Sequence, residues 1–149
     1  MDVVRTYHDE IQLKEEYCLI NNKKEGLYKE YYKNKQLMII CNYINGIRNG
    51  EYKSYYKNGQ LYEEYCLINN KKEGLYKEYY GNSQLMIICN YVDGKKNGEF
   101  NKYYENGHLS FSCNYIDEKI NGECKEYDEN GILKKHKIFD NGIIIQTIL

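Results

Sequence analysis

Cysteine side chains are the first residues of this chain that could do chemistry, as metal ligands or redox pairs. None of the six cysteines makes a Cys-x-x-Cys pair. Three of them, Cys41, Cys89 and Cys113, occupy one position of an internal repeat, which favours a role as small apolar packing residues. Cys113 and Cys124 could oppose each other within one hairpin, but in a reducing cytosol we expect free thiols.

Histidines and paired glutamates are the remaining candidates for metal or acid–base chemistry. His8, His108 and His136 lie far apart in the repeat and lack ligand spacing. Glu15-Glu16 and its copy Glu63-Glu64 come closest to an acid pair, and duplication explains their recurrence without chemistry. Because no nucleophile motif or phosphate loop is present either, we predict a protein that is not an enzyme and has no catalytic residues, metal or cofactor.

A fixed 24-residue period must position all of these residues. Copies occupy 12–35, 36–59, 60–83, 84–107 and 108–131 without insertion or deletion, between partial copies at 1–11 and 132–149. The first and third copies are nearly identical, and the second and fourth share QLMIICNY, so a pair of copies was duplicated. Because a short repeat covers its apolar face only against its neighbours, we predict a single repeat domain over 1–149.

Each copy has the pattern of two β-strands. In the second copy, β-branched and aromatic residues at 37–44 end at Asn45-Gly46, and a second strand over 50–56 ends at Asn58-Gly59. Asn-Gly occurs eight times in the chain, and both residues tolerate the positive φ of hairpin turns. No helical apolar stripe survives these turns. The predicted fold is therefore all-β: an elongated, single-layer antiparallel β-meander of tandem 24-residue β-hairpins.

Antiparallel pairing around these turns predicts one aromatic side of the sheet, which we call the packed face. Its expected members are Leu37, Ile39, Cys41, Tyr43, Gly50, Tyr52 and Tyr56, with the leucines Leu13, Leu61, Leu85, Leu109 and Leu133 and the rings of Tyr28, Tyr32, Tyr76, Tyr80, Phe100 and Tyr104. Tyr17 and Leu19 exchange large and small residues with Cys41 and Tyr43 of the next copy, as a shared volume requires. The glycine that recurs once per copy, as at Gly50, would let a ring lie across bare backbone.

The opposite side, which we call the outer face, carries the candidate partner-binding residues. A tyrosine row (Tyr31, Tyr55, Tyr79, Tyr103 and Tyr127) is accompanied by lysines two residues earlier (Lys29, Lys53, Lys77 and Lys125). Rings beside aliphatic lysine stems predict an adhesive surface for a protein, and the alternative is cross-strand packing that stiffens an exposed sheet. Met38, Ile40, Met86 and Ile88 also fall here, as a contact patch unless twist buries both sides locally.

Two stretches of the repeat carry a resemblance to a known family. Tyr55-Tyr56-Lys57-Asn58-Gly59-Gln60-Leu61 and Tyr103-Tyr104-Glu105-Asn106-Gly107-His108-Leu109 resemble the MORN repeat, with a weaker continuation at Asp140-Asn141-Gly142. The resemblance covers 12–131 and is to the variant found in bacterial proteins labelled YwqK-family antitoxins. It implies a meander of β-hairpins with a role in protein binding, scaffolding or membrane association.

Charge and hydropathy argue against several classes of partner. With 21 basic and 22 acidic residues the chain offers no general attraction to nucleic acid or anionic lipid, and no apolar run is long enough to span a membrane. The start lacks a secretory signal, so we expect a cytoplasmic protein. The apolar end Ile143–Leu149 would be an exposed edge strand, which predicts self-association unless it folds back as a cap.

These patterns predict a non-catalytic MORN-like module that binds a protein partner, in the manner of an antitoxin. The alternatives are a self-associating structural scaffold and a lipid-associating MORN protein. Vesicle binding that weakens with salt would identify the lipid alternative.

Overall fold

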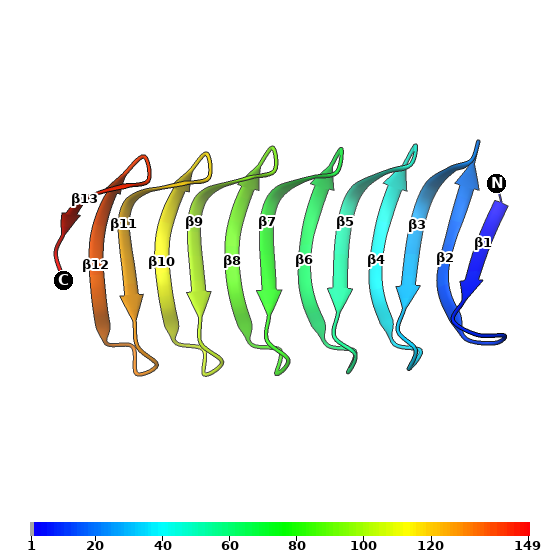
Figure 1. Cartoon of the computed structure of the whole chain (residues 1–149), viewed down its shortest axis with the longest axis horizontal. Helices are drawn as coiled ribbons and strands as arrows, with labels where there is room; N and C mark the ends of the chain where they lie inside the picture. Colours follow the sequence, from blue (N-terminus) through cyan, green and yellow to red (C-terminus); the bar gives the residue numbers. More distant parts are fainter. Residues whose placement is uncertain (1) are drawn as a thin grey trace. The chain divides into compact units, whose positions relative to one another are not determined.

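The computed structural model describes residues 2–149, and the chain divides into two units, Met1–Lys71 and Lys72–Leu149. In the first unit β1 to β6 lie side by side in sequence order, and in the second unit β7 to β13 do the same (Figure 1). Residues 2–149 contain no helix. The predicted all-β, single-layer antiparallel meander is confirmed within each unit, because among residues 2–149 strands pair with their sequence neighbours alone and no second layer covers them.

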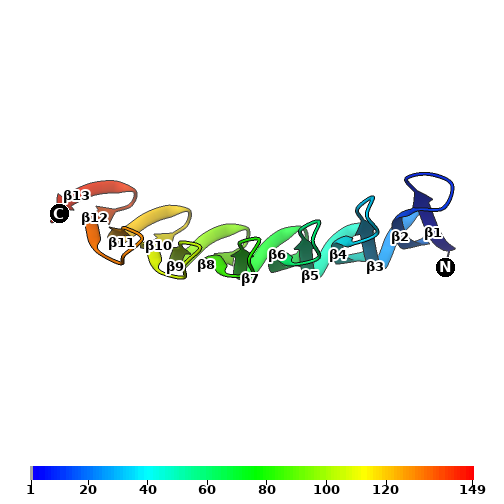
Figure 2. The same cartoon turned by 90° about the horizontal axis from the view of Figure 1, so that it is seen from below.

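Strand lengths repeat as the sequence does. The strands of the first unit are β1 (Asp2–Tyr7), β2 (Leu13–Ile20), β3 (Lys23–Tyr31), β4 (Leu37–Ile44), β5 (Ile47–Tyr55) and β6 (Leu61–Ile68). Those of the second unit are β7 (Lys71–Tyr79), β8 (Leu85–Val92), β9 (Lys95–Tyr103), β10 (Leu109–Ile116), β11 (Lys119–Tyr127), β12 (Leu133–Asp140) and β13 (Ile143–Thr147). Strands such as β8 and β10 are curved ribbons when seen from below (Figure 2).

Two-residue turns close the hairpins in which an even strand precedes an odd one. Asn45 and Gly46 have φ of 53° and 84°, so both central residues are left-handed, as a type I′ turn requires. This confirms the hairpin predicted at Asn45-Gly46. Asp117 and Glu118 adopt the same conformation, with φ of 48° and 70°, although glutamate lacks the tolerance of glycine for it.

The recurrent strand glycine belongs to a bulge. In β4–β5 the partners are Cys41↔Tyr52 and then Tyr43↔Arg48, so β5 contains two extra residues around Gly50, whose φ is 94°. The prediction that a ring lies across this glycine is wrong, because a Cβ at Gly50 would meet only Asn42 atoms, at 3.8 Å. Glycine is needed there for its positive φ.

A second bulge corrects the predicted packed face. Tyr31 lies opposite Leu37, while Glu30 lies opposite Ile39, so Met38 is an extra residue and the alternation of faces is interrupted at it. The leucines predicted on the packed face therefore pair with the tyrosine row: Tyr31↔Leu37, Tyr55↔Leu61, Tyr79↔Leu85, Tyr103↔Leu109 and Tyr127↔Leu133. Opposed residues share one face, so these leucines belong to the outer face.

Within each unit, hydrogen bonds at both edges tie neighbouring copies together. At one edge the Asn70 amide donates to the Arg48 carbonyl at 2.9 Å, and the Glu118 amide to the Lys96 carbonyl at 3.0 Å. At the other edge a tyrosine hydroxyl donates to the carbonyl 23 residues later, as Tyr32 does to Tyr55 at 2.8 Å. These bonds satisfy backbone groups beyond the strand ladders and hold a sheet that has no covering layer.

Candidate functional site

A row of aromatic and cysteine side chains runs across the middle of the packed face. In the first unit Tyr28, Cys41, Tyr52 and Tyr65 are opposed in register, and Cys41 is only 2% exposed. The rings of Tyr52 and Tyr65 stack with centroids 4.6 Å apart. Where Cys41 takes the place of a ring in this row, Tyr43 meets Tyr28 edge-on instead, at 5.7 Å. The predicted exchange of volume between adjacent copies is confirmed.

Cations cover the rings of the packed face, and the sequence analysis missed them. Lys24 Nζ lies 4.2 Å from the centroid of Tyr28 and 4.4 Å from that of Tyr17. Arg48 Cζ lies 5.6 Å from the centroid of Tyr52. Lys72 and Lys96 repeat the contact in the second unit. A basic residue at the same position of four copies was the available signal, and its aliphatic stem covers the rings while its charge contacts their π faces.

Burial favours the neutral form of four side chains of the packed face. It raises the pKa of Tyr52 and Tyr65, and of Tyr28, whose hydroxyl also donates to Glu30 at 3.0 Å. Burial likewise raises the pKa of the Cys41 thiol. These groups are therefore poor nucleophiles and poor proton donors near neutral pH.

The opposition predicted for two cysteines is confirmed. Cys113 and Cys124 are partners across the β10–β11 hairpin, and both are buried, free thiols. The pKa of Cys113 is raised to about 12, chiefly by burial and secondly by the nearby Cys124. A thiol in this state packs as a small apolar residue.

On the outer face, every member of the tyrosine row is half-buried against its leucine partner. The pairing gives the row a cross-strand packing role. A role of the row in partner binding remains a prediction.

The lysines of the outer face form register rows with two of the predicted apolar residues. Ile40 lies between Lys29 and Lys53, and Lys53 Nζ is 3.8 Å from a carboxylate oxygen of Glu64. In the second unit Ile88 is opposite Lys77. Lys125 lies further along that row, opposite His136 and Ser112.

Met38 and Met86 do not join these rows. Each occupies the bulge between a tyrosine-opposed leucine and the next paired isoleucine, so neither has a cross-strand partner. The alternation that placed them beside Ile40 and Ile88 does not hold at that position.

Aliphatic side chains before the two-residue turns make the outer face apolar at one end of its strands. We call them the aliphatic row: Ile20, Ile44 and Ile68 in the first unit and Val92 and Ile116 in the second. Their exposures run from 43% for Ile20 to 55% for Ile44. Exposed aliphatic residues at one repeat position are typical of a contact surface. The sequence analysis missed this row, although its period was visible.

The last strand, β13, lies at one end of the strand order of the second unit. All of its residues are exposed, Ile143 to 69% and Ile145 to 64%. It pairs with β12 alone, so one side of its backbone has no strand partner among residues 2–149. No charged side chain protects it.

Two of the histidine side chains contact backbone carbonyls. His8 Nε2 lies 2.9 Å from the Tyr31 carbonyl, and His108 Nδ1 lies 2.7 Å from the Glu129 carbonyl. Among residues 2–149, no group of three or more histidines, cysteines or carboxylates is arranged to hold a metal ion. No helix in the described chain is long and apolar enough to span a membrane.

Comparison with known families agrees with this architecture. The MORN repeat variant family matches the chain at residues 24–45, 48–69, 72–93, 96–117 and 120–147. The chain therefore belongs to the MORN repeat variant family and is a β-hairpin repeat module, a class that is generally non-catalytic. A comparison with curated proteins found no significant match. Each matched segment starts at the second strand of a hairpin, half a period from the copies counted from residue 12.

Proposed function

We propose that the protein is a non-catalytic module that binds a protein partner through its outer face. The observation that carries the proposal is the aliphatic row, which leaves apolar side chains exposed at a regular spacing, three of them opposite lysines: Ile20↔Lys23, Val92↔Lys95 and Ile116↔Lys119. Burying such side chains would contribute about 25 cal/mol per Å² of apolar surface. The lysine side chains would form a polar rim around the aliphatic row.

The test compares variants that differ only in position on the surface. Ile44→Lys and Ile68→Lys place charges in the aliphatic row, and Ile11→Lys is the matched control because Ile11 is 87% exposed and lies in a turn outside the row. Affinity capture from lysate of the native source should recover a protein with the wild type and the control. The Ile44→Lys and Ile68→Lys variants should lose it while keeping their melting temperature. Equal capture by all four proteins would refute the outer face as the binding surface.

A finer proposal is that the partner is a toxin, which the module neutralises by covering its surface. The resemblance of the repeats to those of YwqK-family antitoxins supports it. A reading frame adjacent to this gene should arrest growth when expressed alone. Growth should resume on co-expression with the wild type and stay arrested with Ile44→Lys. Failure of the wild type to restore growth would leave protein binding in place and remove the toxin.

A second candidate is self-association through β13, favoured by its exposed and uncharged backbone edge. An antiparallel pairing of two β13 strands would satisfy the open N–H and C=O groups of both copies. Light scattering should show a dimer for the full chain and a monomer for a truncation after Gly142. The same mass for both proteins would exclude this edge as the contact.

A further inference from the structure

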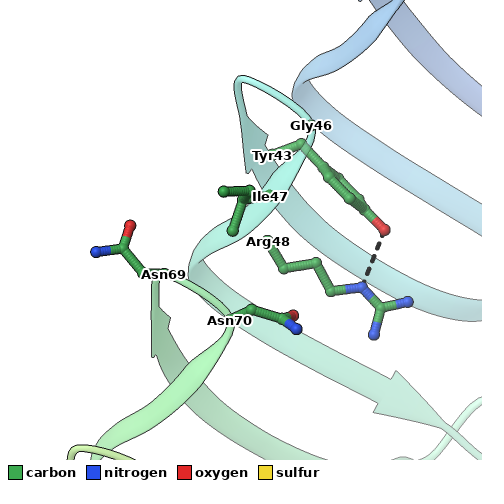
Figure 3. A pocket seen from close by; sticks show the side chains of 6 residues that line it. All are labelled: Tyr43, Gly46, Ile47, Arg48, Asn69 and Asn70. Atoms are coloured by element: carbon green, nitrogen blue, oxygen red, sulfur yellow. Dashed lines mark hydrogen bonds between the residues drawn. The ribbon is translucent and has the colours of Figure 1, made fainter.

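A recess at the edge of the packed face in the first unit holds an arginine without a counter-charge. Tyr43, Gly46, Ile47, Arg48, Asn69 and Asn70 line this recess, whose volume is about 430 Å³. Arg48 projects on the same side as Tyr43 and Asn70, while Ile47 and Asn69 extend the other way (Figure 3). The recess thus presents one guanidinium and one primary amide toward the same space.

The guanidinium of Arg48 is held in a fixed orientation. Its Nε donates to the Tyr43 hydroxyl at 3.0 Å, and its Cζ lies 5.9 Å from the Tyr43 centroid and 5.6 Å from that of Tyr52. This leaves the two terminal nitrogens of the fork with no protein acceptor among residues 2–149. A planar fork with two parallel donors matches the two oxygens of a carboxylate.

No carboxylate of the described chain neutralises this site. Neither Arg48 nor Lys24 forms an ion pair within residues 2–149, yet Lys24 Nζ also lies 5.4 Å from the Tyr43 centroid. Two cations therefore approach one ring, and Arg48 is half-buried. Burial works against the charge of Arg48 and the Tyr43 hydroxyl supports it, so an incoming anion would add the counter-charge that the site lacks.

The equivalent position in the second unit shows what the recess in the first unit lacks. Glu118 stands where Asn70 does, with the same backbone bond to the cation residue, Lys96. The Glu118 carboxylate accepts from the Lys96 amide at 2.6 Å and supplies a negative charge there. Asn70 is neutral, and its side-chain amide has no hydrogen-bond partner among residues 2–149.

We propose that Arg48 and Asn70 form a binding site for a carboxylate, with the two terminal nitrogens of the Arg48 fork donating to both oxygens and the Asn70 amide donating to one of them. The negative charge beside Arg48 would come from the bound ligand, whereas beside Lys96 it comes from the Glu118 carboxylate. It lies on the packed face and does not depend on the proposed role of the outer face.

An NMR titration of the ¹⁵N-labelled chain with sodium acetate tests the site. The Arg48 Nε–H and Asn70 side-chain resonances should shift and saturate in the wild type. Arg48→Met, which keeps the stem over the rings, should weaken the apparent affinity at least about tenfold. Asn70→Glu should do the same by supplying an internal carboxylate. The absence of a saturable shift, or equal shifts in wild type and Arg48→Met, would overturn the proposal.

Further arms fix the chemistry and the source of the ligand. Glu118→Asn should create acetate-dependent shifts at Lys96, and their absence would contradict the role given to the turn residue. Inorganic phosphate should bind more weakly than acetate, and tighter binding would overturn the assignment to a carboxylate. The blocked peptide acetyl-Ala-Glu-Ala-amide, compared with its Gln version, separates two sources. Selective binding of the Glu peptide identifies a protein side chain, and binding of acetate alone identifies a free small carboxylate.

Discussion

The β10–β11 hairpin and the β12–β13 hairpin begin alike and end differently. Both turn through two left-handed residues, but β11 has Gly122 at its bulge, with φ of 86°, where β13 has Gln146. The register of β10–β11 shifts by two residues between Cys113↔Cys124 and Tyr115↔Ile120. That of β12–β13 shifts by one, between Ile138↔Gln146 and Phe139↔Ile144.

The difference in register changes which side chains lie on the packed face. With the glycine bulge, Cys124 arrives opposite Cys113 and is only 7% exposed. Without it, Thr147 takes the place opposite Lys137, and every residue of β13 is exposed. We therefore expect the bulge glycine to decide whether the second strand of a hairpin joins the row of packed side chains, because glycine adopts the required φ with the least strain.

The largest effect should come from removing the bulge glycine. Gly122→Val places a β-branched residue at φ of 86° and should lower the free energy of unfolding by about 2–3 kcal/mol. Urea denaturation followed by circular dichroism measures it. Glu123→Val, at the next and exposed position, should change stability by less than about 0.5 kcal/mol. Equal losses in the two variants would show that the backbone of the bulge does not require glycine.

Alkaline pH should weaken the β10–β11 hairpin more than the β12–β13 hairpin. Burial raises the pKa of Cys113 to about 12 and also raises that of Tyr115, whereas the equivalent residues of β12 are Lys137 and Phe139. The folded chain favours the neutral thiol and phenol, so their contribution is complete below the unfolded thiol pKa of 9.0 and is lost as pH rises toward 12. The free energy of unfolding should fall by up to about 1.4 kcal/mol per pH unit for each group.

The measurement is urea denaturation at about pH 8 and about pH 10.5 for wild type and Cys113→Ala. The wild type should lose more stability between the two conditions, because the variant has one buried titrating group fewer. Identical losses would mean that the Cys113 thiol titrates alike in the folded and unfolded chains.

A smaller effect is expected at the turn that the two hairpins share. Gly142 has φ of 87°, and Gly142→Ala should lower the opening free energy of β13 by about 1 kcal/mol. Hydrogen exchange of the β12 and β13 amides reports it. Gly142→Asn should cost less, since asparagine tolerates this conformation and occupies it at Asn70. An alanine variant with unchanged exchange would show that the turn does not hold β13.

The smallest effect is expected from a substitution that restores the missing glycine. Gln146→Gly should permit the two-residue shift and bring Ile148 opposite Lys137, with a gain of a few tenths of a kcal/mol in β13 protection. A cross-strand Hα–Hα NOE between Lys137 and Ile148 would replace the one between Lys137 and Thr147. Persistence of the original NOE would show that more than residue 146 sets the register at this end.

The candidate site was less predictable than the fold because strand alternation, bulges and side-chain directions each place some of its residues. The lysine row followed from strand alternation, and Lys29 and Lys53 do flank Ile40. Alternation fails at a bulge, however, and so it misplaced the leucines opposite the tyrosine row. The contacts of Lys24 and Arg48 with the rings depend on side-chain directions across strands, which a spacing rule does not contain.

The sequence by itself determined the strands, their antiparallel order within each unit and the positions of the turns. Those features depend on local backbone preferences, which Asn, Asp and Gly express at each turn. Only the tertiary structure decided which face each leucine joins and which cation stays unpaired. Cross-strand register and the meeting of side chains from separate copies are set by pairing between strands, and the residue types of one strand do not encode that pairing.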